Sequence, residues 1–167
     1  LTMSGKGTFS NTNALVLNTT SSKLLLSNTT TVSSVSTSAP SQGVDVDESS
    51  TITSLAVGHK TPVSIAAGKT LSGGITVTAV TGGSSIKLGE TGTLASTVSM
   101  SGGTLDANNN MTISGALSHS GNITIDVYSN KTLTYSGTAI NVGANTITLS
   151  GGGSLVSGGI TLNNAQS

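Results

Sequence analysis

The side chains that could do chemistry are few in this sequence and widely separated. The 167 residues include two histidines, six acidic and six basic residues, and no cysteine. The histidines, His59 and His119, are 60 positions apart, and we expect each to be a solvated turn or face residue instead of a base or a metal ligand. Without cysteine the chain has neither a disulfide framework nor a thiolate metal site.

Two groups of acidic residues are the remaining candidates. Asp45, Asp47 and Glu48 could bind a hard cation such as calcium through oxygen ligands, but we favour a solvated acidic edge. Asp106 and Asp126 could form the carboxylate pair of a polysaccharide-cleaving enzyme. Such enzymes gather several acids in one groove, whereas the acids of this chain are scattered along the sequence. We therefore predict no catalytic, cofactor-binding or metal-binding residue, and a protein that is not an enzyme.

The composition excludes several classes of partner. Charged residues make up 7% of the chain and the net charge is zero, which argues against nucleic acid and against anionic membrane surfaces. No apolar run is long enough to span a membrane. Phe9, Tyr128 and Tyr135 are the aromatic residues, so the core must be built from Val, Ile and Leu.

One short phrase repeats along the sequence: an aliphatic residue, a small polar residue and a second aliphatic residue, with Gly, Asn and Ser between copies. Period-two alternation sends both aliphatic side chains to one face of a strand and the polar one to the other. Short strands separated by turn residues, without a helical pattern, indicate an all-β repeat array. Copies occur at 111–113, 123–125, 133–135, 147–149 and 160–162.

The spacing of the aliphatic residues predicts how the strands stack. Two interleaved series repeat at about 23 to 25 residues, so each period holds at least two strands. We predict a parallel β-solenoid of about seven coils of roughly 23 residues, because one coil alone cannot bury its aliphatic edge. An antiparallel sandwich is the rival, but it gives no reason for this period. The series are Ile52, Ile75, Val98 and Ile123, then Ile65, Leu88 and Met111, and finally Ile123 and Ile147.

The whole chain, 1–167, is interpreted as one solenoid segment of a longer protein. Residues 28–50 are the least regular stretch, and we expect an irregular loop or excursion there, since Pro and Gly mark a turn. The phrases 67–71, 129–133 and 143–147 each place Gly or Asn before a strand. These residues tolerate a left-handed backbone, so we expect corners of the coil there.

The phrases 73–77 and 158–162, supported by 68–71 and 130–133, resemble the passenger regions of bacterial autotransporters and haemagglutinin-like adhesins. The resemblance covers about residues 51–164 and implies a right-handed parallel β-helix exported to the cell surface as a stalk or adhesin. A serine-protease motif such as Gly-Asp-Ser-Gly does not occur in the sequence.

We expect a non-enzymatic structural or adhesive segment of an extracellular bacterial surface protein. Its expected partners are a host or neighbouring-cell surface, with glycans among the candidates, or copies of itself; nucleic acid and membrane insertion of the segment are not expected. The alternative is a carbohydrate-binding or polysaccharide-cleaving β-helix.

Overall fold

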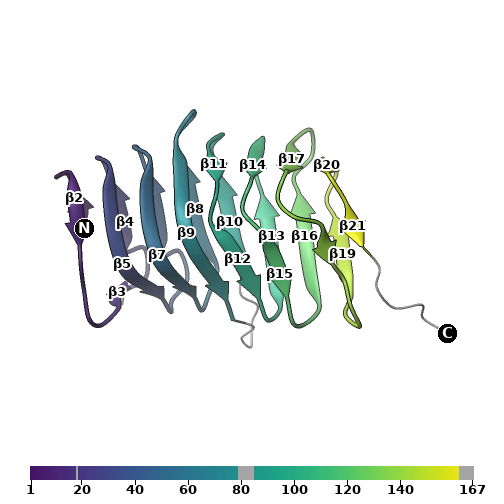
Figure 1. Cartoon of the computed structure of the whole chain (residues 1–167), viewed down its shortest axis with the longest axis horizontal. Helices are drawn as coiled ribbons and strands as arrows, with labels where there is room; N and C mark the ends of the chain where they lie inside the picture. Colours follow the sequence, from purple (N-terminus) through teal and green to yellow (C-terminus); the bar gives the residue numbers. More distant parts are fainter. Residues whose placement is uncertain (18, 79–84, 162–167) are drawn as a thin grey trace.

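The chain winds into a parallel β-solenoid (Figure 1). The computed structural model describes residues 1–17, 19–78 and 85–161, and these residues form strands and turns without a helix. Every strand pair in this part of the chain is parallel, with strands from successive windings side by side, as in Val44 beside Val63. The predicted all-β solenoid of about seven turns is therefore confirmed, and the antiparallel sandwich is excluded. A right-handed coil stays a prediction of the resemblance.

The strands form two long sheets and one short sheet. The first long sheet contains β1 (Thr2–Met3), β4 (Lys23–Leu26), β6 (Gly43–Val46), β8 (Thr61–Ile65), β10 (Ser85–Gly89), β13 (Gly103–Ala107), β16 (Ile123–Val127) and β19 (Ile147–Ser150). The second contains β2 (Gly7–Phe9), β3 (Leu15–Leu17), β5 (Thr30–Thr37), β7 (Ser50–Val57), β9 (Thr70–Val77), β11 (Thr93–Leu94), β12 (Thr97–Met100), β14 (Met111–Ile113), β15 (Leu117–His119), β17 (Thr132–Tyr135) and β20 (Ser154–Ser157). The short sheet pairs β18 (Ile140–Asn141) with β21 (Ile160–Thr161).

The core is one column of aliphatic side chains inside the coil. In β16 the alternation is complete: Ile123, Ile125 and Val127 are buried, while Thr124 and Asp126 lie between them on the outer face. The same pattern recurs in strand after strand, and one continuous buried cluster extends from Leu17 to Ile140. Stacking of coils thus removes from water the apolar edge that a single coil would expose.

Coil length varies more than the sequence predicts. Paired residue numbers differ by 19 for Val44 and Val63, but by 25 for Thr61 and Ile86. Two of the predicted stacked pairs are confirmed, Ile75 with Val98 and Ile123 with Ile147. In the other four cases the structure shows different partners: Ile52 pairs with Gly73, Val63 with Leu88, Leu88 with Ala107, and Val98 with Leu117. The other four predictions were wrong for two reasons. The pairs Leu88 with Met111 and Val98 with Ile123 join residues of different sheets, because both sheets carry the same alternation. The pairs Ile52 with Ile75 and Ile65 with Leu88 are in the correct sheet but out of register, since Leu55 pairs with Ile75 and Val63 with Leu88.

The predicted corners are confirmed. Gly68, Asn130 and Gly143 all have a left-handed backbone, with φ of 72°, 60° and 59°. Each lies in a turn closed by one backbone hydrogen bond, and a strand follows each turn. The closing bonds run from Lys69 N to Ala66 O (2.9 Å), from Lys131 N to Tyr128 O (3.0 Å) and from Asn145 N to Val142 O (3.2 Å).

Residues 28–50 do not form the irregular excursion that we predicted. They contain β5 and β6, which pair in register with the strands of both neighbouring coils. The turn between these strands is held by Gln42, whose side chain is buried. Its Oε1 accepts from Ser38 N (2.7 Å) and Ala39 N (3.0 Å), and its Nε2 donates to Thr19 O (3.1 Å) of the preceding coil. The prediction was wrong because the Gln42 side chain satisfies backbone groups of this turn and ties it to the preceding coil, so the Pro and Gly residues mark a tight turn and not a loop that leaves the coil.

Glycine is required where one coil crosses closely over the next. A Cβ placed on Gly115 would lie 2.0 Å from the carbonyl oxygen of Ser96, a backbone atom that cannot move without disturbing the neighbouring coil. Gly158, in contrast, has open space around the Cβ position and no left-handed backbone. Neither glycine has a positive φ, so the two positions differ in the space available for a Cβ and not in backbone conformation.

We predict that Gly115→Ala lowers the free energy of unfolding by about 1–3 kcal/mol, the usual cost of overpacking. Gly158→Ala, the matched control, should change it by less than about 0.5 kcal/mol. Urea denaturation followed by circular dichroism measures both values. Equal stability of the two variants would contradict the close approach of the coils at Gly115.

Candidate functional site

The acidic residues at 45–48 do not converge on a cation site. Asp45 pairs with Lys23 (Nζ to Oδ2, 3.0 Å), and Glu48 pairs with Lys69 (Nζ to Oε2, 2.8 Å). The two lysines come from the coils on either side, so each acid is neutralised separately. Among residues 1–17, 19–78 and 85–161, no three His, Cys, Asp or Glu side chains lie together as metal ligands would. Val44 and Val46 are buried and Asp45 faces outward, as the alternation predicts.

The two histidines lie in different settings. His59 is in a turn, where its Nδ1 accepts a hydrogen bond from the backbone N–H of Lys60 (2.9 Å). This local contact and the half-exposed position agree with the expected turn residue. His119 ends β15 and lines a cavity, which the sequence did not predict.

Asp106 and Asp126 are direct neighbours on the outer face of the first sheet, although they are scattered in the sequence. They occupy opposite positions of β13 and β16, and the same row continues to Lys87 on one side and Ser150 on the other. Neighbouring strands lie about 4.8 Å apart, so the two carboxyl groups are within range of mutual repulsion. Asp126 accepts a hydrogen bond from Ser150 Oγ (2.6 Å).

The surroundings of Asp106 both raise and lower the pKa of its carboxyl group, and the net effect is to raise it. Burial raises the pKa of the Asp106 carboxyl above its ordinary value of 3.8; Lys87 counteracts this, Asp126 raises the pKa further, and Lys60 lowers it. When the Asn108 amide is turned to match donors with acceptors, its NH₂ donates to Asp106 Oδ1 (2.6 Å) and its oxygen accepts from Lys87 Nζ (3.0 Å). In this row, one lysine and two acidic residues from three successive coils therefore lie side by side.

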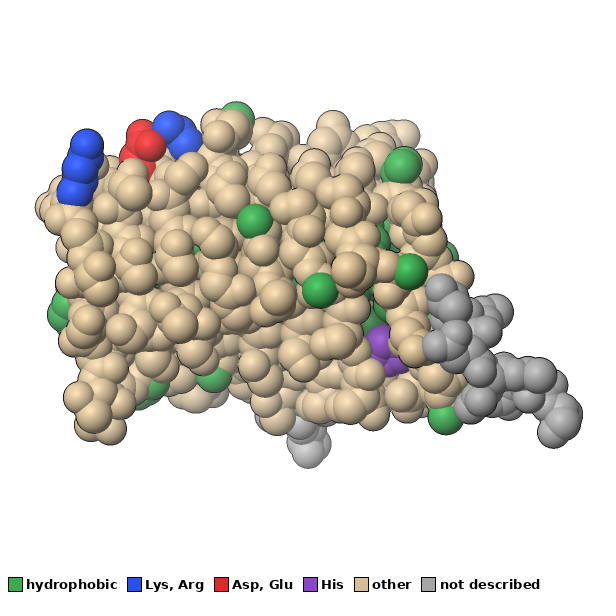
Figure 2. Space-filling model, in the orientation of Figure 1, with side chains coloured by type: hydrophobic (Ala, Val, Ile, Leu, Met, Phe, Trp, Pro, Cys, Tyr) green, Lys and Arg blue, Asp and Glu red, His purple; other side chains and the backbone are tan. Residues whose placement is uncertain are grey.

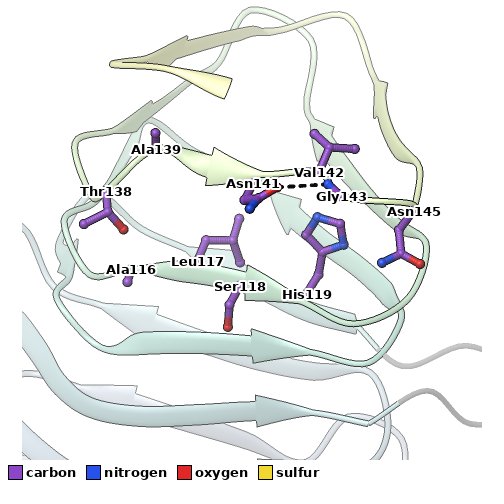
Figure 3. Close-up of a pocket in the computed structure, with 10 residues that line it drawn as sticks. All are labelled: Ala116, Leu117, Ser118, His119, Thr138, Ala139, Asn141, Val142, Gly143 and Asn145. Atoms are coloured by element: carbon purple, nitrogen blue, oxygen red, sulfur yellow. Dashed lines mark hydrogen bonds between the residues drawn. The ribbon is translucent and has the colours of Figure 1, made fainter. Parts of the chain in front are cut away.

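A second polar feature is a cleft where the second sheet is interrupted. β15 pairs with β12 on one side, but β18 on its other side pairs with β21 instead of with β15. The opening between β15 and β18 is a cavity of about 400 Å³ (Figure 3). Its apolar lining comes from Ala116, Leu117, Ala139 and Val142. We call it the β15–β18 cleft.

Tyr135 links the two sides of the interruption. It occupies an inward position in register with Ile113, and its ring is buried in the core. Its hydroxyl accepts from the backbone N–H of Leu117 (3.0 Å) and donates to the carbonyl of Thr138 (2.5 Å). The phenol therefore supplies hydrogen bonds to both sides of the interruption, where a regular ladder would use backbone groups.

The imidazole of His119 stands in the β15–β18 cleft, between β15 and the segment that contains Asn141 and Gly143 (Figure 3). Its Nδ1 lies 2.9 Å from the carbonyl oxygen of Gly121, and because a carbonyl only accepts, Nδ1 carries the proton of that bond. Its Nε2 is buried and has no partner among the described residues. In the neutral ring this nitrogen is an acceptor without a donor.

Sequence reasoning missed the cleft for a definable reason. The large Tyr135 replaces an aliphatic residue in the repeated phrase, and His119 follows two residues after the inward Leu117. A tyrosine at an inward position of a thin aliphatic core is the one feature of the sequence that could have indicated a local irregularity. The interrupted pairing itself depends on how two coils stack, which no local pattern encodes.

The comparisons with known proteins add no assignment. The chain matches no protein-family model, no curated protein and no solved structure. In the described part of the chain, no helix is long and apolar enough to cross a membrane.

The raised pKa of Asp106 predicts a pH dependence of stability. The native state holds this proton more tightly than the unfolded chain, so its stabilising effect is complete below pH 3.8 and is lost as pH rises through the raised pKa. We expect Asp106→Asn to reduce this fall in unfolding free energy. Asp47→Asn, at an exposed position, should keep the wild-type slope. Urea denaturation at a series of pH values checks this, and an unchanged slope in Asp106→Asn would contradict it.

Proposed function

We propose that this chain is a non-enzymatic structural or adhesive segment of an extracellular bacterial surface protein. The supporting observation is a straight stack of coils whose outer rows carry small uncharged hydroxyl side chains. One such row contains Thr70, Thr93, Thr112 and Thr134, one residue from each of four successive coils. A rod of this kind separates what lies at its two ends and offers the same surface along its length.

The surface chemistry supports contact over a broad area. Figure 2 shows a face made mostly of backbone and uncharged polar side chains, with the few charged atoms along one edge towards the N-terminal end. The ion pairs Lys23–Asp45 and Lys69–Glu48 neutralise charge locally. An uncharged hydroxyl surface binds other polar, uncharged surfaces through many weak hydrogen bonds, because no strong charge repels or orients the partner.

The proposed location and partners follow from the resemblance to autotransporter and haemagglutinin-like passengers. The likeness of the repeated phrases supports a cell-surface stalk, and the solenoid fold is compatible with it. The proposed partners are a host or neighbouring-cell surface, including its glycans, or further copies of the rod. Coil-by-coil stacking would let such a chain fold progressively after export, because each coil contacts its immediate neighbours.

We predict that Thr112→Lys combined with Thr134→Lys reduces adhesion. These residues face outward on adjacent strands, so two lysines add charge to an uncharged row without entering the core. Attachment of protein-coated beads to cell layers and to glycan-coated surfaces should fall several-fold relative to the wild type. Circular dichroism establishes that the variant is folded.

The matched control places two lysines at exposed turn positions, Thr12→Lys with Thr20→Lys, which lie outside the strand rows. This control should adhere like the wild type. If both double variants lose adhesion equally, net charge explains the effect and the row does not. If the wild-type protein attaches no better than an inert protein coat, the adhesive role of this segment is contradicted.

The second candidate is a carbohydrate-binding or polysaccharide-cleaving β-helix. The neighbouring positions of Asp106 and Asp126 favour it, since carboxyl groups close together can serve as acid and nucleophile. Incubation with acidic and neutral polysaccharides should release no new reducing ends if the structural role is correct. Release that disappears in Asp126→Asn would support cleavage and overturn the non-enzymatic proposal.

A further inference from the structure

Hydrogen bonds hold the β15–β18 cleft open as an ordered part of the fold. The hydroxyl of Tyr135 links two residues that line it, accepting from Leu117 N (3.0 Å) and donating to Thr138 O (2.5 Å). The opening therefore persists without leaving the Leu117 donor unpaired. A cavity of about 400 Å³ is towards the small end of the range typical of ligand pockets, which suits a compact ligand.

His119 supplies an acceptor that lacks a donor. The bond from Nδ1–H to the carbonyl of Gly121 (2.9 Å) fixes the ring orientation, and the buried Nε2 has no partner in the described part of the chain. A buried acceptor that is left unpaired is destabilising. A ligand hydroxyl donated to Nε2 would remove that penalty, so the cleft favours ligands that carry O–H groups.

The remaining polar groups are uncharged amides and hydroxyls. Asn141 Oδ1 accepts from Gly143 N (3.0 Å), which leaves its NH₂ group without a partner among the described residues. The side chains of Asn145 and Thr138 also line the cavity, and neither has a side-chain hydrogen bond within the described residues. None of the described residues that line the cleft is Lys, Arg, Asp or Glu, so nothing here would compensate a charged ligand.

We propose that the β15–β18 cleft binds an uncharged, hydroxyl-bearing ligand of about monosaccharide size. Hydroxyl groups of such a ligand donate to His119 Nε2 and accept from the amide of Asn141 or Asn145. Its C–H face packs on Leu117 and Val142, so the apolar and the polar residues of the lining both contact the ligand. This inference does not depend on the rod acting as a stalk or adhesin, because it concerns a soluble small ligand at one cleft.

The test is a titration of the ¹⁵N-labelled chain with glucose, galactose, mannose and N-acetylglucosamine, followed by NMR. We expect at least one sugar to shift the His119 ring nitrogen and the side-chain amides of Asn141 and Asn145, with saturation at millimolar concentrations. His119→Phe, which keeps a ring but loses the acceptor, should weaken binding about tenfold, the equivalent of one hydrogen bond. Asn145→Ala should weaken sugar binding by a similar factor. This second variant tests the cleft independently if His119→Phe does not fold.

His59→Phe is the matched control, because His59 lies in a turn and does not line the cleft. It should bind like the wild type. The proposal is overturned if no sugar produces a saturable shift, if His119→Phe binds as tightly as the wild type, or if only a charged ligand or an extended peptide shifts these resonances. An ordered water at Nε2 with no response to sugars also overturns it.

Discussion

The constraint on which the structure depends is that no coil can bury its own apolar residues. Each winding has a thin row of Val, Ile and Leu, and that row is dry only when another winding lies above or below it. Leu149 shows the consequence: it continues the inward row after Ile125, yet it is 56% exposed because no further described coil covers it. Stability is therefore a property of the stack, accumulated through neighbour contacts.

The same constraint explains the unusual composition. The core is built almost entirely from aliphatic side chains; Tyr135 is its buried aromatic residue, and it stays in register with Ile113 and Ser157. Charges are rare because outward residues of adjacent strands lie directly over one another, so like charges would repel along a row. Asp106 and Asp126 are the exception, and Lys87 and Ser150 extend their row on either side.

The sequence predicts the fold class well because alternation and turn residues are local properties. The inward Ile123, Ile125 and Val127 follow from a period of two, and the corner at Asn130 follows from its tolerance of a left-handed backbone. Register is harder to predict, since coil length changes at the turns and shifts which residues meet. For that reason the sequence alone places neither Asp106 beside Asp126 nor His119 in a cleft.

The central claim is parallel, in-register stacking of successive coils, and engineered disulfides test it most directly because the natural chain has no cysteine. Thr124 and Thr148 face each other on adjacent strands, so a Thr124→Cys and Thr148→Cys pair should oxidise readily. Thr124→Cys with Ser150→Cys, two residues out of register, should stay reduced, since Cα atoms more than about 7 Å apart cannot be bridged. Cross-linking of the second pair in preference to the first would contradict the stacking.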